Sequence, residues 1–379
     1  MPSSSPVTPL PRWDIFCRVI DNFGDIGVCW RLARELSLAH GKSVRLWVDD
    51  LSVFSCLEPR IHPTLPSQTL DGIECNLWEE GIPPSFSGAE CVIEAFACNL
   101  PPVYLAGMAK HPQPPRWINL EYLSAERWVE DCHGLSSPHP QLGLVKTFFF
   151  PGFTTRTGGL PWGKKPKGAE KTFLLEQGIT EYFSGVTTSL FAYETAPVKA
   201  LLGAWISSPV PVRCLVTDGK AYKVVSDILG EKAFKTPLGS LELYPLPFLP
   251  QADYDQLLLA CDLNLVRGED SFVRAQWAAK PFLWQIYPQS QKEHLTKLDA
   301  FLSRYTTGMS QAAQSSCQTF HTVWNTPENA QSERAMALAW LAWLKTRAEQ
   351  ETHAKSWAAH YAKQPNLAEN IVRQTCSPL

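Results

Sequence analysis

This 379-residue sequence lacks a large surplus of charge of either sign. It has 34 Lys and Arg and 37 Asp and Glu, which give a formal net charge of −3. Without a positive surplus, a protein has no general attraction for nucleic-acid phosphates or for anionic lipid. The balance argues against electrostatic binding of either kind as the main activity. We therefore expect no nucleic-acid partner and no membrane partner.

Long hydrophobic runs are also missing. The most apolar stretches, residues 91–100 and 335–344, fall short of the roughly 18 apolar residues that a membrane-spanning helix needs. Residues 1–11 contain Ser and Pro but neither a basic start nor an apolar core, so they lack the layout of a signal peptide. We expect them to form a flexible tail on a cytoplasmic protein.

Paired cysteines and short catalytic motifs are absent as well. The 11 cysteines include no Cys-x-x-Cys pair, and the 9 histidines form no local cluster at metal-ligand spacing. Such scattered thiols are typical of reduced cysteines in the cytosol, and not of a disulfide framework or a zinc site. Gly-x-x-x-x-Gly-Lys, Gly-x-Gly-x-x-Gly and His-Glu-x-x-His are missing too, which leaves kinase, dehydrogenase and zinc-protease activities without support.

What the sequence does contain is a regular alternation of strand and helix patterns. Residues 15–20 form an apolar run typical of a buried strand, residues 21–25 form a polar turn, and residues 26–36 carry apolar side chains at helical spacing before Gly41. Further strands are expected at residues 43–48, 91–93, 117–120, 147–150, 187–193, 212–216, 241–243, 263–266 and 282–285. Strands that alternate with helices predict parallel sheets and an α/β fold class.

The length exceeds what one hydrophobic core usually spans, and the composition changes to Gly, Pro, Thr and Lys between residues 153 and 171. We place a domain boundary there. The expected parts are a flexible tail at 1–11, an N-terminal Rossmann-like domain at 12–165, a C-terminal Rossmann-like domain at 166–350, and C-terminal helices at 351–379 that pack back on the N-terminal domain. Doubly wound domains of this kind bind ligands beyond the carboxyl ends of their strands, so we expect a central cleft between the two.

The segment 263–276 passes from an apolar strand through a polar turn into a helical pattern. A helix capped there by Asp270 or Ser271 directs free N–H groups and a positive dipole end toward a ligand, where they can hold a diphosphate. Arg267 would add positive charge. The alternative is an ordinary strand-to-helix turn in which Glu269 and Asp270 cap the helix and Arg267 pairs with them, and the spacing alone leaves both interpretations open.

Residues 21–27 place two carboxylates, Asp21 and Asp25, four positions apart at the end of the first strand. The neighbouring Gly24 allows the backbone to approach a ligand closely. Such carboxylates can accept a proton or orient a cationic acceptor. The alternative is that Asp25 simply caps the following helix.

Aromatic side chains lie at two expected strand ends. Phe191 and Tyr193 lie near the end of one strand, and Phe248 lies between another strand and the next helix, three residues before Gln251. An aromatic face can stack on a nucleotide base and an amide can hydrogen-bond to the edge of the base. For each aromatic residue taken alone, a place in the core is the better explanation, because aromatic side chains at strand ends are commonly buried.

One further pattern, Asp253-Tyr254-Asp255, matches the Asp-x-Asp of metal-dependent glycosyltransferases. Two carboxylates can bind a hard cation that bridges a diphosphate. Both residues, however, fall in the first turn of an expected helix, where acidic side chains complement the helix dipole. We therefore expect no metal ion and no cofactor.

Several of these segments together resemble the protein-arginine rhamnosyltransferases of bacterial elongation factor P. The similar stretches are Ile20-Asp21-Asn22-Phe23-Gly24-Asp25-Ile26-Gly27, Trp30 to Arg34, Glu94 to Cys98, Glu121 to Glu126, Phe248 to Gln251, Arg267 to Gln276 and Trp284 to Gln289. The resemblance implies a GT-B glycosyltransferase fold, in which an acceptor-side N-terminal domain and a nucleotide-sugar-binding C-terminal domain face a central cleft. It also implies a metal-independent, inverting transfer of rhamnose from dTDP-β-L-rhamnose to one arginine of elongation factor P.

By the same resemblance, individual residues acquire roles. Asp25 is the general base, Asp21 places the acceptor guanidinium, and Glu269 is a second essential carboxylate beside the donor. The residues implied in donor binding are Asn22, Phe23 and Gly24 at the sugar, Tyr193, Phe248 and Gln251 at the thymine base, and Arg267, Gly268, Glu269, Asp270 and Ser271 along the ribose and diphosphate.

Two other functions stay open at this point. A nucleotide-sugar epimerase shares the two-domain fold, and it would convert the donor without any acceptor protein. A non-enzymatic nucleotide-sugar sensor or scaffold would use the same cleft, and its carboxylates would affect affinity but not turnover.

Overall fold

A computed structural model describes residues 12–20, 23–78, 85–161, 169–180, 182–289, 291–326 and 332–376. The chain divides into two compact units, the first formed by Met1–Trp162 with Pro365–Leu379 and the second by Gly163–Gln364. The expected tail at 1–11 and the position expected for the boundary, 165/166, lie outside the described residues.

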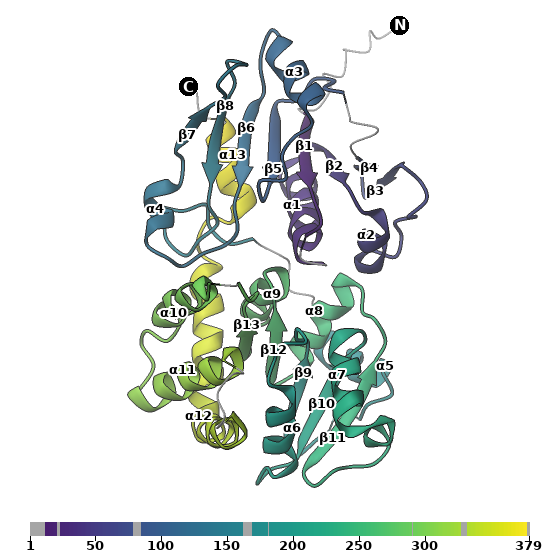
Figure 1. Cartoon of the computed structure of the whole chain (residues 1–379), viewed down its shortest axis with the longest axis vertical. Coiled ribbons are helices and arrows are strands. Elements are labelled where there is room, and N and C mark those ends of the chain that lie inside the picture. Colours follow the sequence, from purple (N-terminus) through teal and green to yellow (C-terminus); the bar gives the residue numbers. More distant parts are fainter. Residues whose placement is uncertain are drawn as a thin grey trace, which may run out of the picture. The chain divides into compact units, whose positions relative to one another are not determined.

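The first unit contains an eight-stranded sheet with the order β3-β4-β2-β1-β5-β6-β8-β7 (Figure 1). Its strands are β1 (Arg12–Cys17), β2 (Ser43–Val48), β3 (Ser67–Leu70), β4 (Ile73–Leu77), β5 (Cys91–Ala95), β6 (Arg116–Leu120), β7 (Ser136–Pro138) and β8 (Val145–Phe149). The central pairs are parallel, and antiparallel hairpins β3/β4 and β7/β8 form the two edges. Its helices are α1 (Gly24–His40), α2 (Leu51–Leu57), α3 (Pro102–Lys110), α4 (Trp128–Cys132) and α13 (Leu367–Cys376).

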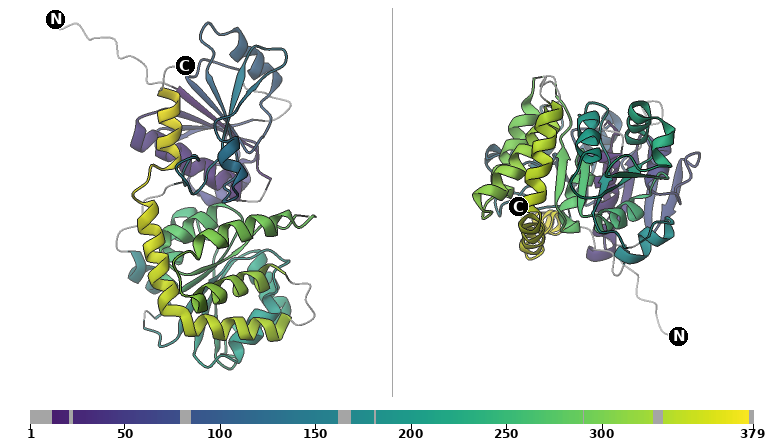
Figure 2. Two further views of the ribbon diagram at one scale, coloured as in Figure 1. Left: turned by 90° about the vertical axis from the view of Figure 1, so that its left-hand side faces the viewer. Right: turned by 90° about the horizontal axis from the view of Figure 1, so that it is seen from below.

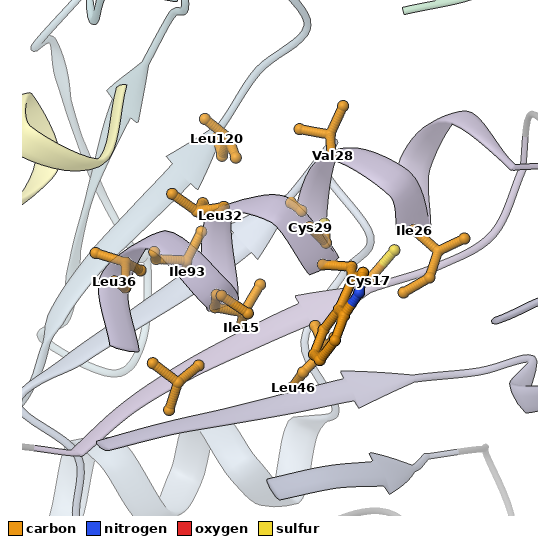
Figure 3. Close-up of a cluster of buried hydrophobic side chains, with 14 of the residues drawn as sticks. Ile15, Cys17, Ile26, Val28, Cys29, Leu32, Leu36, Leu46, Ile93 and Leu120 are labelled. Carbon is orange, nitrogen blue, oxygen red and sulfur yellow. The ribbon is translucent and has the colours of Figure 1, made fainter. Parts of the chain in front are cut away.

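The helix α1 packs its apolar face on the sheet of the first unit. Figure 3 shows side chains of α1 such as Leu32 and Leu36 directed toward Ile15 of β1 and Ile93 of β5. The helix ends at Gly41, whose φ of 61° lets its N–H bond to the carbonyls of the last turn. The packing holds α1, which begins at Gly24, against β5 and against β1, which ends at Cys17.

The last helix, α13, belongs to the first unit although it comes at the end of the sequence. Leu367, Ala368 and Ile371 are buried in the same hydrophobic cluster as α1 and β1. The side chain of Asn366 donates a hydrogen bond to Glu35 of α1 at 2.7 Å. The preceding helix α12 (Ser332–Tyr361) runs without interruption through residues 350 and 351.

The second unit contains a five-stranded parallel sheet with the order β11-β10-β9-β12-β13. Its strands are β9 (Val186–Leu190), β10 (Val212–Thr217), β11 (Leu241–Leu246), β12 (Leu263–Arg267) and β13 (Phe282–Gln285). The helices before β13 are α5 (Ala169–Glu176), α6 (Val198–Ile206), α7 (Lys220–Leu229), the 3₁₀ helix η1 (Glu231–Phe234), α8 (Gln251–Ala260) and α9 (Asp270–Ala278). The helices after β13 are α10 (Glu293–Tyr305), α11 (Gln311–Asn325) and α12. All five strands expected here are present, but β9 ends at Leu190 and not at residue 193, so Phe191 and Tyr193 follow the strand. The strand order reverses between β9 and β12, and this reversal is where ligands bind in doubly wound sheets.

The helices that follow β13 form a layer of their own. In the views of Figure 2, α11 and α12 lie side by side, and α12 also packs against α6. The aromatic rings of Trp340 and Trp343 on α12 are buried in the core of this unit. No helix among the described residues is long and apolar enough to cross a bilayer.

The first strand differs from its expected position, because β1 spans Arg12–Cys17 and not residues 15–20. The strand therefore includes the charged residues Arg12 and Asp14, which an apolar run does not contain. In the structure, Asp14 is fully buried, and its carboxylate accepts hydrogen bonds from the Arg45 guanidinium of β2 and from the Tyr104 hydroxyl of α3. A buried carboxylate is tolerated in a strand when a cation and further donors compensate for its lost hydration.

His321 on α11 gives the second unit a predictable dependence on pH. The side chain is buried, and burial lowers its pKa to about 4. Between about pH 6.5 and that value the unfolded chain binds a proton that the folded protein does not, so the free energy of unfolding falls as the pH drops. Stability should be complete above about pH 6.5 and lower by roughly 2 kcal/mol at about pH 5 from this group alone.

Urea unfolding at about pH 7.5 and about pH 5 measures this effect. The His321→Gln variant should lose less stability over that interval than the unchanged protein. The control is His360→Gln. His360 is exposed on α12, so its replacement should not change how much stability the protein loses between the two pH values. An equal loss in His321→Gln and in the unchanged protein would contradict the assignment.

Candidate active site

Asp25 lies in the first turn of α1, beyond the carboxyl end of β1. Its side chain is only 2% exposed. One carboxylate oxygen, Oδ2, accepts the N–H of Ile20 at 2.8 Å, and the other, Oδ1, accepts the hydroxyl of Tyr122 at 3.0 Å. The two bonds come from different segments of the chain, so both carboxylate oxygens are held in place.

The simple capping interpretation of Asp25 is wrong. Phe23 occupies the N-cap position of α1, and Asp25 lies two residues further on, inside the helix. Its Oδ2 bonds to Ile20, which precedes the helix, so the carboxylate closes the loop between β1 and α1. Gly24 is the first residue of the helix, whereas Asp21 and Asn22 lie outside the described residues.

Tyr122 is a site residue that the motif analysis did not assign. It follows β6, and its hydroxyl reaches the Asp25 carboxylate from a point 97 residues away in sequence. The stretch 121–126 resembles the known family, but nothing in its spacing connected it with residues 21–27. Only the pairing of β1, β5 and β6 in one sheet brings them together.

In the second unit, Arg267 ends β12 and is 7% exposed. Its guanidinium carbon lies 4.3 Å from the centre of the Phe191 ring and 4.7 Å from that of Tyr193. Its Nη1 donates a hydrogen bond to the Ala192 carbonyl at 3.1 Å. The cation is therefore held by the segment that follows β9, which also carries the two aromatic side chains predicted to be near the base.

The turn from β12 into α9 is closed by several specific contacts. Gly268 has a φ of 61°, a left-handed conformation that favours glycine. The Ser271 hydroxyl accepts the N–H of Arg267 at 3.0 Å and donates back to the carbonyl of the same residue. The indole N–H of Trp284 donates to the Gly268 carbonyl at 2.7 Å.

The expected cap of α9 by Asp270 or Ser271 is wrong, because Glu269 occupies the N-cap position and its side chain makes no cap hydrogen bond. Asp270 and Ser271 lie inside the first turn. Ser271 is used for the turn at Arg267, and Asp270 accepts a hydrogen bond from Gln251 Nε2 at 3.2 Å. The first N–H groups of α9 point out of the helix at its positive end, which is the geometry that binds anions.

The predicted base-binding residues are brought close to the turn. Gln251, the first residue of α8, is buried and contacts Asp270 of α9, while Phe248 is half-buried three residues earlier. The N–H of Tyr193 donates to Gln285 Oε1 at 2.7 Å, and its ring packs edge-on against that of Tyr287 at 5.6 Å. Gln285 and Tyr287 lie in the similar stretch 284–289, which was the signal that could have identified them.

The Asp-x-Asp pattern has a structural explanation that differs from the one expected. Asp255 is buried, and its Oδ1 accepts a hydrogen bond from Nε of the buried Arg274 at 2.9 Å. The pair joins α8 to α9, so dipole complementarity is not the main reason for this carboxylate. The sequence showed the acidic pair but not the arginine 19 residues later that neutralises it.

A cavity of about 310 Å³ lies in the second unit, where β13 ends. Its lining includes Thr195, Gln285, Gln289, His294 and Asn325. None of the residues predicted to bind the donor lines it. The cavity and the turn at Gly268 share one element, since Gln285 lines the first and its carbonyl accepts the N–H of Gly268 at 3.3 Å.

The fold defines a class of protein. A solved structure of UGT2 from Phytolacca americana, in complex with UDP-2-fluoro-glucose and pterostilbene, is 9% identical to this chain, matches it with a TM-score of 0.56, and covers 96% of this chain and 98% of its own. With doubly wound domains of this kind, the protein has the GT-B fold of glycosyltransferases, as the sequence predicted.

The family follows from closer matches. The family model for elongation-factor P (EF-P) rhamnosyltransferase EarP matches residues 13–375. A protein-arginine rhamnosyltransferase of Pseudomonas putida is 44% identical over 374 residues, which cover 95% of this chain and 97% of that relative. A structure that explains EarP-mediated arginine glycosylation of translation elongation factor EF-P is 32% identical, with a TM-score of 0.64 over 96% of this chain and 97% of that one. The chain belongs to the EarP family of EF-P rhamnosyltransferases.

Proposed function

We propose that this chain transfers L-rhamnose from dTDP-β-L-rhamnose to an arginine side chain of elongation factor P, with inversion at the anomeric carbon and without a metal ion. The observation that carries this proposal is the buried Asp25 carboxylate, held at both oxygens beyond the carboxyl end of β1. The family relationship supports the acceptor and the sugar. The reducing compartment in which elongation factor P works agrees with the free thiols of the described cysteines, and we place the protein in the cytoplasm.

The reaction needs a carboxylate because arginine is a poor nucleophile. A guanidinium has a pKa above about 12, so it stays protonated and its nitrogen lone pairs are delocalised. A carboxylate can bind it through two hydrogen bonds and aim one nitrogen at the anomeric carbon. As the C–N bond forms and the bond to dTDP breaks, that nitrogen becomes acidic and its proton passes to the carboxylate.

We assign these steps to the acidic residues predicted from the sequence. Asp25 accepts the proton, Asp21 helps to place the guanidinium, and Glu269 acts as a second carboxylate beside the donor. Asn22, Phe23 and Gly24 contact the sugar.

The leaving group requires positive potential, and the start of α9 can supply it. The positive end of the helix dipole, its first N–H groups and the buried guanidinium of Arg267 all give positive potential near Gly268. We propose that Arg267, Gly268, Asp270 and Ser271 hold the ribose and diphosphate. Tyr193, Phe248 and Gln251 hold the thymine base, in agreement with the contact between Gln251 and Asp270.

Intact-mass spectrometry of elongation factor P tests the proposal. After incubation with the purified chain and dTDP-β-L-rhamnose, the acceptor should gain the mass of one deoxyhexosyl group, and an acceptor whose target arginine is replaced by lysine should gain none. A donor-only reaction is the control for an epimerase, which would change the donor without acceptor. An unchanged acceptor mass in the presence of intact donor would refute the proposed transfer.

A further inference from the structure

The turn that follows β5 adopts a backbone conformation that side-chain-bearing residues rarely take. Phe96, Ala97 and Asn99 have φ values of 55°, 52° and 60°, and none of them is glycine. Three such residues within four positions are costly, and they persist only where the surroundings impose the conformation. Strained turns of this kind cluster at functional sites, where they hold particular side chains in place.

Glu94, the second-last residue of β5, binds the turn through its buried carboxylate. Its side chain is 1% exposed. Its Oε1 accepts the N–H of Asn99 at 3.0 Å, and its Oε2 accepts the indole N–H of Trp117 at 3.0 Å and lies 3.3 Å from Nζ of Lys146. The turn is thus fixed by a buried carboxylate that is itself anchored on β6 and β8.

What the strained turn positions is the ring of Phe96. The Phe96 ring is 7% exposed and stacks on the ring of Tyr122, with centroids 4.3 Å apart and an angle of 14° between the planes. The N–H of Phe96 also donates to the Leu120 carbonyl at 2.7 Å, which ties the turn to the end of β6 just before Tyr122. Tyr122 itself is 37% exposed, so the stack, and not enclosure, sets the direction of its hydroxyl.

The hydroxyl of Tyr122 ends this chain of contacts at Asp25. It donates to Oδ1 at 3.0 Å, while the N–H of Ile20 donates to Oδ2 at 2.8 Å. Because donors from two segments of the chain bind its two oxygens, the carboxylate cannot rotate about its terminal bond without losing a hydrogen bond. The plane of the carboxylate is thereby fixed, which it needs to be if the group is to receive a proton from a guanidinium in a defined place.

We propose that Tyr122, oriented by Phe96, is a positioning residue that sets the plane of the Asp25 carboxylate for the transfer reaction. The inference rests on the proposed function, in which Asp25 accepts the proton. Tyr122 then acts through Asp25, and the strained turn after β5 serves the reaction without touching either substrate.

The test is the Tyr122→Phe variant, which removes the hydroxyl and keeps the ring that stacks on Phe96. With elongation factor P as acceptor, kcat should fall about ten- to a hundred-fold, the effect of losing one hydrogen bond to a charged group in the reacting state. The dissociation constant of dTDP should stay within about two-fold, because no donor contact is removed. Tyr182→Phe is the matched control, since the side chain of Tyr182 is 86% exposed, and it should keep full turnover.

A double variant separates this inference from the proposed function. If Tyr122 acts only through Asp25, adding Tyr122→Phe to Asp25→Asn should cause no further loss. A further loss would overturn the positioning role and indicate that Tyr122 contacts a substrate. Full turnover in Tyr122→Phe alongside an inactive Asp25→Asn would overturn the positioning role and leave the proposed function intact, whereas full turnover in Asp25→Asn would remove the proposed base itself.

Discussion

The Asp25→Asn variant is expected to lose rhamnose transfer by about a hundred- to ten-thousand-fold, the range that a general base contributes. Asparagine has nearly the same shape, and its side-chain oxygen can still accept the N–H of Ile20, so the loop between β1 and α1 should keep its structure. What the variant cannot do is accept the proton of the attacking guanidinium. Single-turnover measurement with saturating donor and acceptor reports that loss directly.

A neighbouring carboxylate offers the matched control for this substitution. Asp49, directly after β2, accepts the N–H of Val19 at 2.8 Å and therefore holds the residue that precedes Ile20. Asp49→Asn should keep most of the turnover, and both variants should bind dTDP as the unchanged protein does. Turnover by Asp25→Asn close to that of Asp49→Asn would rule out the role of Asp25 as the base.

The second large effect is expected at Arg267, on the donor side. In Arg267→Met the apolar stem remains, but the guanidinium that lies against Phe191 and Tyr193 is lost. Because we propose that this charge holds the diphosphate, dTDP should bind about ten- to a hundred-fold more weakly to the variant, as expected for the loss of one charge-assisted hydrogen bond. Isothermal titration calorimetry with dTDP measures the change, and a parallel titration with UDP shows whether the site discriminates between the two bases.

Arg213 separates this effect from a general loss of stability. It is 2% exposed, its guanidinium carbon lies 4.2 Å from the Phe183 ring centre, and its Nη1 donates to the Thr180 carbonyl at 2.8 Å. The environment resembles that of Arg267. Arg213, however, lies at the amino end of β10, whereas Arg267 lies at the carboxyl end of β12, so the two arginines are at opposite ends of the parallel strands. Arg213→Met should lower the midpoint of thermal unfolding without changing the dTDP affinity. Equal dTDP affinities in Arg267→Met and the unchanged protein would contradict the donor assignment.

The sequence predicted the class of the fold because its central strands are apolar and alternate with helices. It missed the edge hairpin of β3 and β4, since residues of Ser67–Leu70 are polar and alternately exposed. A signal was present in Asp71-Gly72, whose φ values of 51° and 80° are those of a two-residue hairpin turn. Edge strands bury one face at most, so apolar runs are a poor guide to them.

The candidate site was predictable residue by residue but not as a set of contacts. The spacing of Asp21 and Asp25 showed two carboxylates after a strand, yet it did not exclude the simpler explanation that Asp25 caps a helix. Two hydrogen-bond partners of Asp25 decide between these explanations. Ile20 is 5 residues away in sequence, whereas Tyr122 is 97 residues away and comes close only because the strands pair. Likewise, no spacing rule connects Asp255 with Arg274 before α8 and α9 are packed together.

The return of the chain to its first unit constrains the order of folding during synthesis. The second unit is one continuous stretch, Gly163–Gln364, and can fold once that stretch has left the ribosome. The sheet and α1 of the first unit are synthesised before that stretch, but their core lacks the apolar side chains of α13 until residues 367–376 have been made. The apolar surface of the sheet and α1 that α13 covers therefore stays exposed to water while the whole second unit is synthesised.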